Sequence, residues 1–247
     1  MRLEDFFQEH SRLALAFSGG TDSAFLMQQA VKAGIDVHAY YVKTAFQPDF
    51  EYRDALRLSE ELGCRMTVIE LDVLSDDTVR SNPADRCYYC KKNIFGEILK
   101  VAARDGYTEV MDGTNASDSA DDRPGMKALE EMKVFSPLRL CDITKSDVRR
   151  LSKEAGLWTW DKPSYACLAT RVPSGTAIDN AILRRIEDGE ELLSKLGFRD
   201  YRIRQDGDNA RLVLRPCDMH LAIDKREQLL AALGESYSKI VIDLEGR

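Results

Sequence analysis

The sequence of 247 residues lacks any long hydrophobic run, and this absence argues against a transmembrane helix, which needs about 18 consecutive apolar residues. The first ten residues, MRLEDFFQEH, lack the basic start and apolar segment of a secretory signal, so we expect a cytoplasmic protein. Basic residues are outnumbered, because 35 Lys and Arg stand against 42 Asp and Glu, a net charge of −7. Nucleic-acid phosphates attract a basic surface, so we expect neither a nucleic-acid nor a membrane partner.

Strand-like and helix-like segments alternate over the first two thirds of the sequence. Buried strands are predicted at residues 13–17, 37–42, 66–71 and 109–112. Amphipathic helices are predicted at residues 22–33, 51–62, 88–104 and 144–155. Such alternation is typical of βαβ units, so we predict an α/β fold with a doubly wound parallel sheet and helices on both faces.

The character of the sequence changes after residue 157. Residues 158–176 are rich in Pro, Gly, Ser and aromatic residues, as in an ordered functional loop that joins two parts. Further elements are predicted as a helix at 178–196, strands at 200–205 and 209–215, a helix at 218–233 and a strand at 240–243. We therefore predict one domain over residues 1–160 and a smaller C-terminal α+β domain over residues 161–247.

A glycine-rich loop lies between the first predicted strand and the first predicted helix. It consists of Ser18, Gly19, Gly20, Thr21, Asp22 and Ser23. Two glycines let the backbone turn tightly and approach an anion, and the helix N-terminus and the hydroxyl groups supply donors. Asp22 is unusual beside an anion, and a Mg²⁺ ion between its carboxylate and a phosphate would explain it. An ordinary tight βα turn with Ser and Asp caps is the alternative interpretation.

Only two of the six cysteines, Cys87 and Cys90, stand close together, and in a reducing cytosol all six should be thiols. Their C-x-x-C spacing lets both sulfurs reach one metal, and a predicted helix N-terminus with two lysines favours thiolates. A further ligand is needed, and Cys167 in the irregular loop 162–171 is the strongest candidate. With three thiolates and no nearby His, a three-cysteine iron–sulfur cluster fits better than structural zinc or a thioredoxin-like redox pair.

Several segments taken together resemble one protein family. They are AFSGGTDSAFL (16–26), NPADRCYYCKKN (82–93), DGTNASDSADDRPG (112–125), SPL (136–138), WDKPSYACLATRVPSGT (160–176) and LGFRDYRIR (196–204). The glycine-rich loop resembles the pyrophosphate loop (PP-loop) of the adenine nucleotide alpha hydrolase-like ATP pyrophosphatases, and the GxxxxGK[ST] of kinases is absent. Over most of its length the sequence resembles the LarE family, ATP-dependent sulfur transferases that build the nickel-pincer nucleotide cofactor of lactate racemase.

This resemblance implies a substrate and a reaction. The substrate is pyridinium-3,5-biscarboxylic acid mononucleotide, one carboxylate of which attacks the α-phosphate of ATP and releases pyrophosphate. A protein-held sulfur then displaces AMP from the acyl-adenylate and leaves a thiocarboxylate, after which the second carboxylate is treated likewise. The resemblance also implies a sulfide donor and homo-oligomeric assembly.

The source of the sulfur differs within the family. Members with one cysteine, at the position of Cys167, give up its sulfur and keep dehydroalanine. Members with cysteines at the positions of Cys87, Cys90 and Cys167 hold a [4Fe–4S] cluster that carries the sulfur. This sequence has all three, so the resemblance implies ATP, Mg²⁺ and a [4Fe–4S] cluster, with the sacrificial cysteine as the alternative.

The resemblance also assigns further residues of the predicted site. ATP contacts are expected from Ala16, the residues of the glycine-rich loop, Gly113 and Thr114. The predicted substrate-phosphate set is Arg202, Arg204, Glu190 and Arg171. The two arginines at 202 and 204 alternate on a predicted strand, so both project to one face and suit a phosphate. A basic surface strand and a Glu on a helix surface are the plainer interpretations.

A D-x-x-D-x-R-P-G pattern contributes Asp118, Asp121 and Arg123, although a solvated acidic loop explains it nearly as well. Asp122 stands where the family usually has Tyr, so a role for that ring is in doubt.

Three other functions compete with sulfur transfer to a mononucleotide. A tRNA thiolase shares the activation step, but the net charge of −7 and the lack of an extra RNA-binding module count against it. An amidotransferase-type synthetase would leave the cysteines unexplained, and the sequence shows no glutaminase segment. A nucleotide sensor or zinc-stabilised binding module would bind ATP without releasing pyrophosphate.

Overall fold

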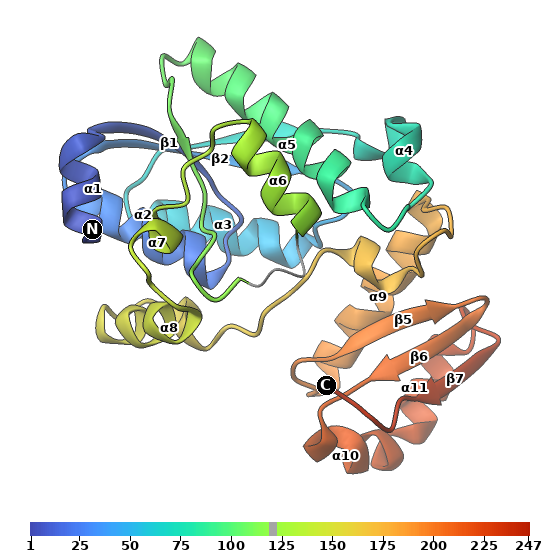
Figure 1. Ribbon diagram of the computed structural model, residues 1–247. Helices are drawn as coiled ribbons and strands as arrows, with labels where there is room; N and C mark the ends of the chain where they lie inside the picture. Colours follow the sequence, from blue (N-terminus) through green and yellow to red (C-terminus); the bar gives the residue numbers. More distant parts are fainter. Residues whose placement is uncertain (119–122) are drawn as a thin grey trace. The chain divides into compact units, whose positions relative to one another are not determined.

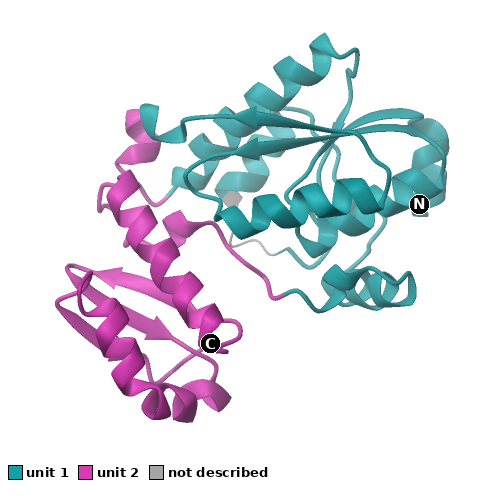
Figure 2. Ribbon diagram, turned by 180° about the vertical axis from the view of Figure 1, so that it is seen from behind, with its two compact units in different colours: residues 1–75, 85–162 teal, residues 76–84, 163–247 magenta. Residues whose placement is uncertain are grey.

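The computed structural model describes residues 1–118 and 123–247, and these fall into two compact units (Figure 2). Unit 1 comprises Met1–Ser75 and Asp85–Lys162, and unit 2 comprises Asp76–Ala84 and Pro163–Arg247. The functional boundary expected after residue 160 stays a prediction. Within the described ranges, no helix is both long and apolar enough to cross a bilayer.

Unit 1 is built on a four-stranded parallel sheet (Figure 1). Its strands are β1 (Arg12–Ala16), β2 (Asp36–Lys43), β3 (Met66–Glu70) and β4 (Val110–Met111). The order across the sheet is β3-β2-β1-β4, and every pairing is parallel. The α/β fold with a parallel sheet, predicted from the alternation of strands and helices, is confirmed.

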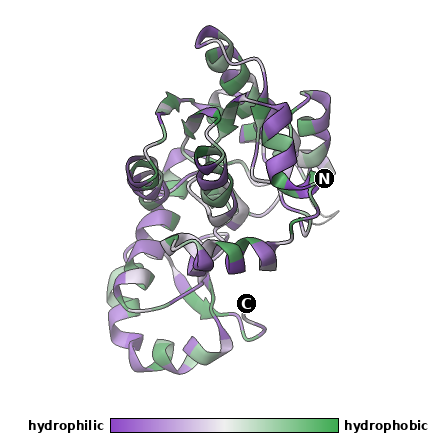
Figure 3. Cartoon of the chain, turned by 90° about the vertical axis from the view of Figure 1, so that its left-hand side faces the viewer, coloured by the Kyte–Doolittle hydropathy of each residue, from purple (hydrophilic) through white to green (hydrophobic). Residues whose placement is uncertain are grey.

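Helices pack on both faces of this sheet, because the central strand β1 has buried side chains on both sides. The helices of unit 1 are α1 (Leu3–Glu9), α2 (Thr21–Lys32), α3 (Asp49–Glu61), α5 (Arg86–Arg104), α6 (Arg123–Glu131), α7 (Pro137–Leu140) and α8 (Lys145–Glu154). Leu13 and Leu15 of β1 belong to the apolar cluster with α1, α2, α3, α7 and α8, whereas Ala14 belongs to the cluster with α5 and α6. The helices carry both hydrophilic and hydrophobic residues along their length (Figure 3).

The strand order reverses between β1 and β4, at the carboxyl ends of these two strands. The chain leaves β1 for β2 on one side, while β4 joins β1 from the other side. In open parallel sheets, ligands bind where the strand order reverses in this way. The glycine-rich loop follows β1 and residues 112–115 follow β4, so both segments begin at this point.

Unit 2 contains a three-stranded sheet of β5 (Arg202–Asp206), β6 (Asn209–Val213) and β7 (Lys239–Ile242). The pairing of β5 with β6 is antiparallel, and that of β6 with β7 is parallel. The helices of this unit are α4 (Asp77–Arg80), α9 (Asn180–Lys195), α10 (Met219–Asp224) and α11 (Arg226–Leu233). The single helix predicted at 218–233 is therefore two helices, since Lys225 between them leaves helical geometry at φ −97° and ψ 16°.

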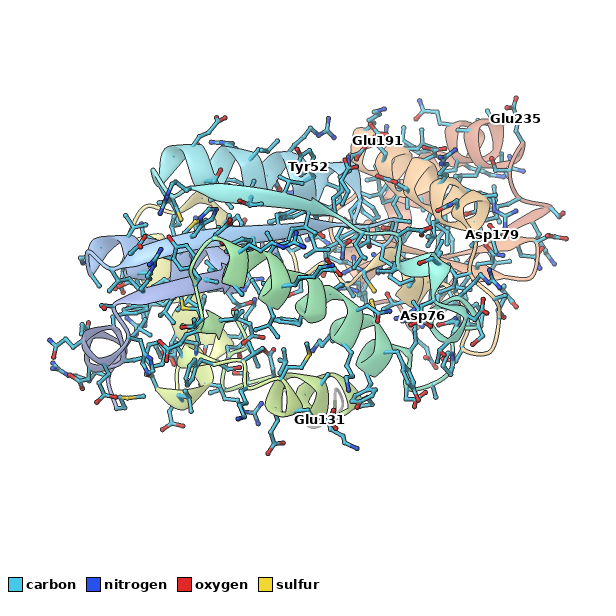
Figure 4. All side chains as sticks on the ribbon, turned by 90° about the horizontal axis from the view of Figure 1, so that it is seen from above. Tyr52, Asp76, Glu131, Asp179, Glu191 and Glu235 are labelled. Atoms are coloured by element: carbon cyan, nitrogen blue, oxygen red, sulfur yellow. The ribbon has the colours of Figure 1, made fainter. Side chains whose placement is uncertain are left out.

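Two aspartates determine where helices of unit 2 begin (Figure 4). The Asp76 carboxylate accepts from the amides of Thr78 and Val79, and the Asp179 carboxylate accepts from that of Ile182. Such N-caps satisfy amides that have no partner inside the helix.

Asn82 ties the segment Asp76–Ala84 to the rest of unit 2. It is buried, and its backbone adopts a positive φ of 55°. Its side-chain amide donates to the carbonyls of Val172 and Pro173 at 3.4 and 2.9 Å, and its own carbonyl accepts from the amide of Gly175 at 2.7 Å.

Candidate active site

The glycine-rich loop turns sharply because Gly19 adopts a positive φ of 70°. A Cβ atom added to Gly19 would lie 3.0 Å from the Cβ of Ala55 on α3. Glycine is therefore required here for two reasons, the backbone conformation and the close approach of α3. The tight turn was predicted from the sequence and the close approach of α3 was not, while the approach of an anion stays a prediction.

The N-terminus of α2 has no side-chain cap in the described structure, where Gly20 is the N-cap residue. The Ser18 hydroxyl is exposed in front of it, 3.1 Å from the Ser23 hydroxyl, and accepts from the amide of Gly20 at 3.3 Å. The Thr21 hydroxyl is buried and donates to the carbonyl of Thr159 at 2.9 Å. An uncapped helix N-terminus with a hydroxyl before it provides donors and a positive dipole end for a phosphate.

The carboxylate of Asp22 lies between a cation and an amide. The Lys145 ammonium contacts one carboxylate oxygen, and the Asn115 amide donates to the other at 3.3 Å. The sequence analysis did not identify Lys145, although a signal was present. Lys145 is the first residue of α8, where a cation opposes the helix dipole, and such a local conflict often marks a functional site.

Lys162 also contacts the glycine-rich loop, and it was not predicted from the sequence either. Its ammonium donates to the carbonyl of Gly19 at 3.2 Å and pairs with Asp54 at 2.7 Å. The two lysines place two positive charges beside the glycine-rich loop, which suits a polyanionic ligand.

The segment after β4 packs directly against the start of α2. A Cβ on Gly113 would lie 2.9 Å from the amide nitrogen of Ser23, so only glycine fits. Asp112 is buried, and it accepts from the amide of Thr114 at 3.3 Å and the hydroxyl of Ser136 at 2.7 Å. Burial raises the pKa of Asp112, which these hydrogen bonds offset only in part. Ala16, the last residue of β1, is half-buried at the same edge of the sheet.

The C-x-x-C pair lies in the first turn of α5. Cys87 and Cys90 are three positions apart, so both lie on one side of the helix, and both thiols are half-buried. A guanidinium nitrogen of Arg86 lies 3.7 Å from the Cys87 sulfur, and a neighbouring cation favours a thiolate. Lys92, expected to serve this purpose, pairs instead with Glu131 at 3.3 Å.

Cys167 belongs to unit 2, where it precedes the short 3₁₀ helix Leu168–Arg171. The Arg171 side chain is 1% exposed and pairs with that of Glu190, which is 4% exposed, at 2.9 Å. Burial lowers the pKa of Arg171, but its hydrogen bond and charge contact with Glu190 prevail and raise it above the usual value. Both residues were expected at the substrate phosphate, and in this structure they bind each other.

Arg202 and Arg204 of β5 differ in their surroundings. Arg202 is buried, and it contacts the carbonyl of Ser164. Burial and the charges of Arg171 and Arg247 lower the pKa of Arg202 to about 10. Arg204 is exposed on the same strand. The pair predicted to act together on a phosphate therefore presents one accessible guanidinium and one enclosed guanidinium.

No family model matches the sequence. A pyridinium-3,5-bisthiocarboxylic acid mononucleotide synthase of Lactiplantibacillus plantarum is 35% identical over 240 residues, covering 95% of this chain and 86% of that protein. The chain belongs to this synthase family. The resemblance predicted from the motifs is thereby confirmed.

Two further relatives differ in how much of the chain they match. An uncharacterized protein of Synechocystis sp. is 32% identical over 252 residues, covering 99% of this chain and 92% of its own length. A tRNA-specific 2-thiouridylase of Frankia alni is 30% identical over 188 residues, which are 62% of this chain but only 53% of that enzyme. The similarity to this thiouridylase therefore extends over only part of each chain.

The donor groups of the chain suit the ions that the family implies. Cys87, Cys90 and Cys167 are half-buried thiols, the first two in unit 1 and the third in unit 2. Thiols are soft donors that suit iron, whereas the carboxylate of Asp22 is a hard donor that suits Mg²⁺. Among the residues that the structure describes, no three His, Cys, Asp or Glu side chains form a group that could hold a metal.

The acidic loop that was predicted before α6 is described only in part. The Asp118 carboxylate accepts from the amide of Asn115 at 2.8 Å, so it stabilises a local turn. Asp121 and Asp122 lie outside the described residues, and Arg123 is the first residue of α6.

Proposed function

We propose that this protein is an ATP-dependent sulfur transferase that converts the carboxylates of pyridinium-3,5-biscarboxylic acid mononucleotide into thiocarboxylates. The observation that carries the proposal is the 35% identity with the L. plantarum synthase, which extends over 95% of the chain. The product named for that enzyme has two thiocarboxylates, and each differs from a carboxylate by one sulfur in place of one oxygen. A carboxylate exchanges its oxygen only after activation, and the nucleotide site of unit 1 suits that step.

The first step is the attack of a substrate carboxylate oxygen on the α-phosphorus of ATP. A new P–O bond forms, the bond to pyrophosphate breaks, and the product is an acyl-adenylate. Negative charge grows on the leaving pyrophosphate, so preorganised donors near it lower the barrier. The N-terminus of α2, the Ser18 hydroxyl and the ammonium groups of Lys145 and Lys162 are the donors and charges that this chain supplies.

In the second step a sulfur nucleophile attacks the acyl carbon, the C–O bond to AMP breaks, and AMP leaves with the electron pair. We assign Cys167, Cys87 and Cys90 to the sulfur-handling site, where they would hold a [4Fe–4S] cluster that supplies the transferable sulfur when bound. Asp22 would hold Mg²⁺, which would neutralise phosphate charge. Arg204, exposed on β5, is the residue of the predicted phosphate set that is accessible to the substrate.

Two alternatives stay open within this proposal. In the sacrificial version Cys167 loses its own sulfur and becomes dehydroalanine. In the tRNA thiolase version the activated group is a base oxygen, which the partial identity with 2-thiouridylases favours. A cytoplasmic location, a sulfide donor and homo-oligomeric assembly belong to the proposal as well.

The test is a pyrophosphate-release assay with ATP and the dicarboxylate mononucleotide on anaerobically purified protein, combined with iron and labile-sulfide analysis. We expect substrate-dependent pyrophosphate release, about four irons per chain, and loss of iron in Cys87→Ala but not in the control Cys141→Ala. Loss of about 34 Da from Cys167 after turnover, without iron, would establish the sacrificial version. No pyrophosphate from a folded sample with this substrate would refute the proposal, and release with unmodified tRNA instead would establish a thiolase.

A further inference from the structure

The loop that carries Cys167 is held by a buried polar cluster within unit 2. Its centre is the carboxylate of Glu190 on α9, which accepts from four donors. They are the Tyr165 hydroxyl, two guanidinium nitrogens of Arg171 at 2.9 and 3.1 Å, and the backbone amide of Ile203 at 2.9 Å. An ionised carboxylate has about four acceptor sites, so Glu190 has no site left for a ligand.

The aromatic ring of Tyr165 lies between two cations. The Arg171 guanidinium carbon is 4.6 Å from the ring centroid, and that of Arg202 is 5.0 Å from it. Cations at such distances are attracted to the face of an aromatic ring. The ring and the hydroxyl group of Tyr165 are thus both restrained, although the residue lies in an irregular segment.

The same arginines hold the backbone on both sides of Tyr165. A guanidinium nitrogen of Arg171 donates to the carbonyls of Ala166 and Cys167 at 2.8 and 3.4 Å. Arg202 donates to the carbonyl of Ser164, which also accepts from Arg247 at 3.3 Å. Three carbonyl groups in a segment of four residues are therefore held by charged side chains, whose hydrogen bonds are stronger than those of neutral groups.

We propose that Tyr165, Glu190 and Arg171 form a positioning clamp for the Cys167 loop, which presents the thiol in one fixed orientation. This proposal rests on the proposed function, in which Cys167 takes part in sulfur transfer. The clamp acts through the backbone of Cys167 and does not touch the substrate. It gives Arg171 and Glu190 a role other than phosphate binding, and it adds Tyr165, which the sequence analysis regarded as part of the cysteine loop only.

Catalytic groups must be held within a fraction of an ångström of the productive position, and irregular loops do not achieve this without supporting contacts. A cysteine that attacks or carries sulfur for an acyl-adenylate has this requirement. Burying the charges of Arg171 and Glu190 costs desolvation free energy that their mutual attraction often only offsets. A positioning role gives a reason for burying this ion pair that stability alone does not.

The test compares Tyr165→Phe with Tyr237→Phe, which alters a buried tyrosine of unit 2 whose ring contacts Arg185 instead. The full-length chain, reduced and purified with a chelator, is exposed to iodoacetamide for timed intervals. The labelling of Cys167 is measured by peptide mass spectrometry relative to that of the exposed Cys217, an internal standard in the same unit. Loss of the Tyr165 hydrogen bond is expected to raise this ratio about tenfold, which corresponds to about 1.4 kcal/mol.

A merely structural role for Tyr165 predicts another result. Tyr165→Phe would then lower the melting temperature, while the labelling ratio would stay within about twofold of the wild-type value, and that result would overturn the proposal. Arg247→Gln loosens the same loop at Ser164 and is expected to raise the ratio as well. It keeps the test decisive if Tyr165→Phe fails to fold, since an unchanged ratio in Arg247→Gln would then overturn the clamp.

A second readout separates this proposal from the proposed function. The clamp predicts that Tyr165→Phe lowers the thiocarboxylate formed per pyrophosphate released, whereas Tyr237→Phe does not. If the wild-type protein releases no pyrophosphate, the proposed function fails, and the labelling ratio still decides the clamp.

Discussion

Three glycines of unit 1 allow backbone strain and steric crowding to be measured separately at the nucleotide site. Gly34 has a positive φ of 74°, but no atom would lie within 4 Å of an added Cβ. Gly19 combines a positive φ of 70° with Ala55 at 3.0 Å. Gly113 has no positive φ, yet its added Cβ would lie 2.9 Å from the backbone of Ser23.

The expected losses in the free energy of unfolding follow from these differences. Gly34→Ala is destabilised only by the left-handed conformation, by about 1–2 kcal/mol. Gly113→Ala is destabilised only by crowding against backbone that cannot move aside easily, by about 1–3 kcal/mol. Gly19→Ala is destabilised by both effects and should lose about 2–5 kcal/mol.

Urea unfolding measures these losses, and calorimetric titration with a non-hydrolysable ATP analogue measures binding. Gly34→Ala should lose stability and keep the wild-type affinity, because Gly34 follows the far end of α2. Gly19→Ala and Gly113→Ala should lose affinity by about tenfold or more, since the first displaces the glycine-rich loop from α3 and the second displaces the start of α2. The reasoning is refuted if Gly34→Ala is as damaging as Gly19→Ala, or if Gly113→Ala binds the analogue like the wild type.

Two further predictions concern residues around the glycine-rich loop, Asp112 and Lys145. Burial raises the pKa of Asp112, so its contribution to stability is fully present below its ordinary pKa of about 4 and is lost as the pH rises through the raised value. Relative to Asp112→Asn, the wild type should therefore lose free energy of unfolding as the pH rises from about 4 towards 7, and parallel urea-unfolding profiles would contradict this. Lys145→Gln removes a cation beside Asp22 and should weaken binding of the ATP analogue about tenfold in calorimetry, whereas Lys153→Gln at the other end of α8 should not. An unchanged affinity in Lys145→Gln would show that Lys145 only neutralises Asp22.

The sheet of unit 1 could be predicted from the sequence because its strands are nearly continuous apolar runs between helical segments. Gly34 and Gly63 each follow a helix in a left-handed conformation, so glycine in the sequence is a local signal of these two helix ends. The break at Lys225 could not be predicted, because the residues around it have helical character and only their tertiary packing separates α10 from α11. The local sequence pattern therefore predicted the elements of the α/β part better than those of the C-terminal part.

The candidate site was predictable where its residues are adjacent in the sequence and not where they come from distant segments. The glycine-rich loop was found because six neighbouring residues carry the signal. Lys145 reaches Asp22 across 123 positions, and Lys162 reaches Gly19 across 143, so no local pattern relates them. The alternation rule placed Arg202 and Arg204 on one face, but it could not show that residues near Cys167 enclose only the first of them.

The bonds of Asn82 also have a consequence for the order in which the protein is made. Asn82 leaves the ribosome 90 residues before Val172, the residue whose carbonyl its side chain contacts. At a synthesis rate of about 5–20 residues per second, several seconds pass between the synthesis of the segment Asp76–Ala84 and that of the residues it contacts. A truncated chain that ends at Lys162 would retain this segment without its partners, and one that begins at Pro163 would lack α4. Unit 2 can therefore be completed only after translation of the whole chain, and its stability should be studied in the intact protein.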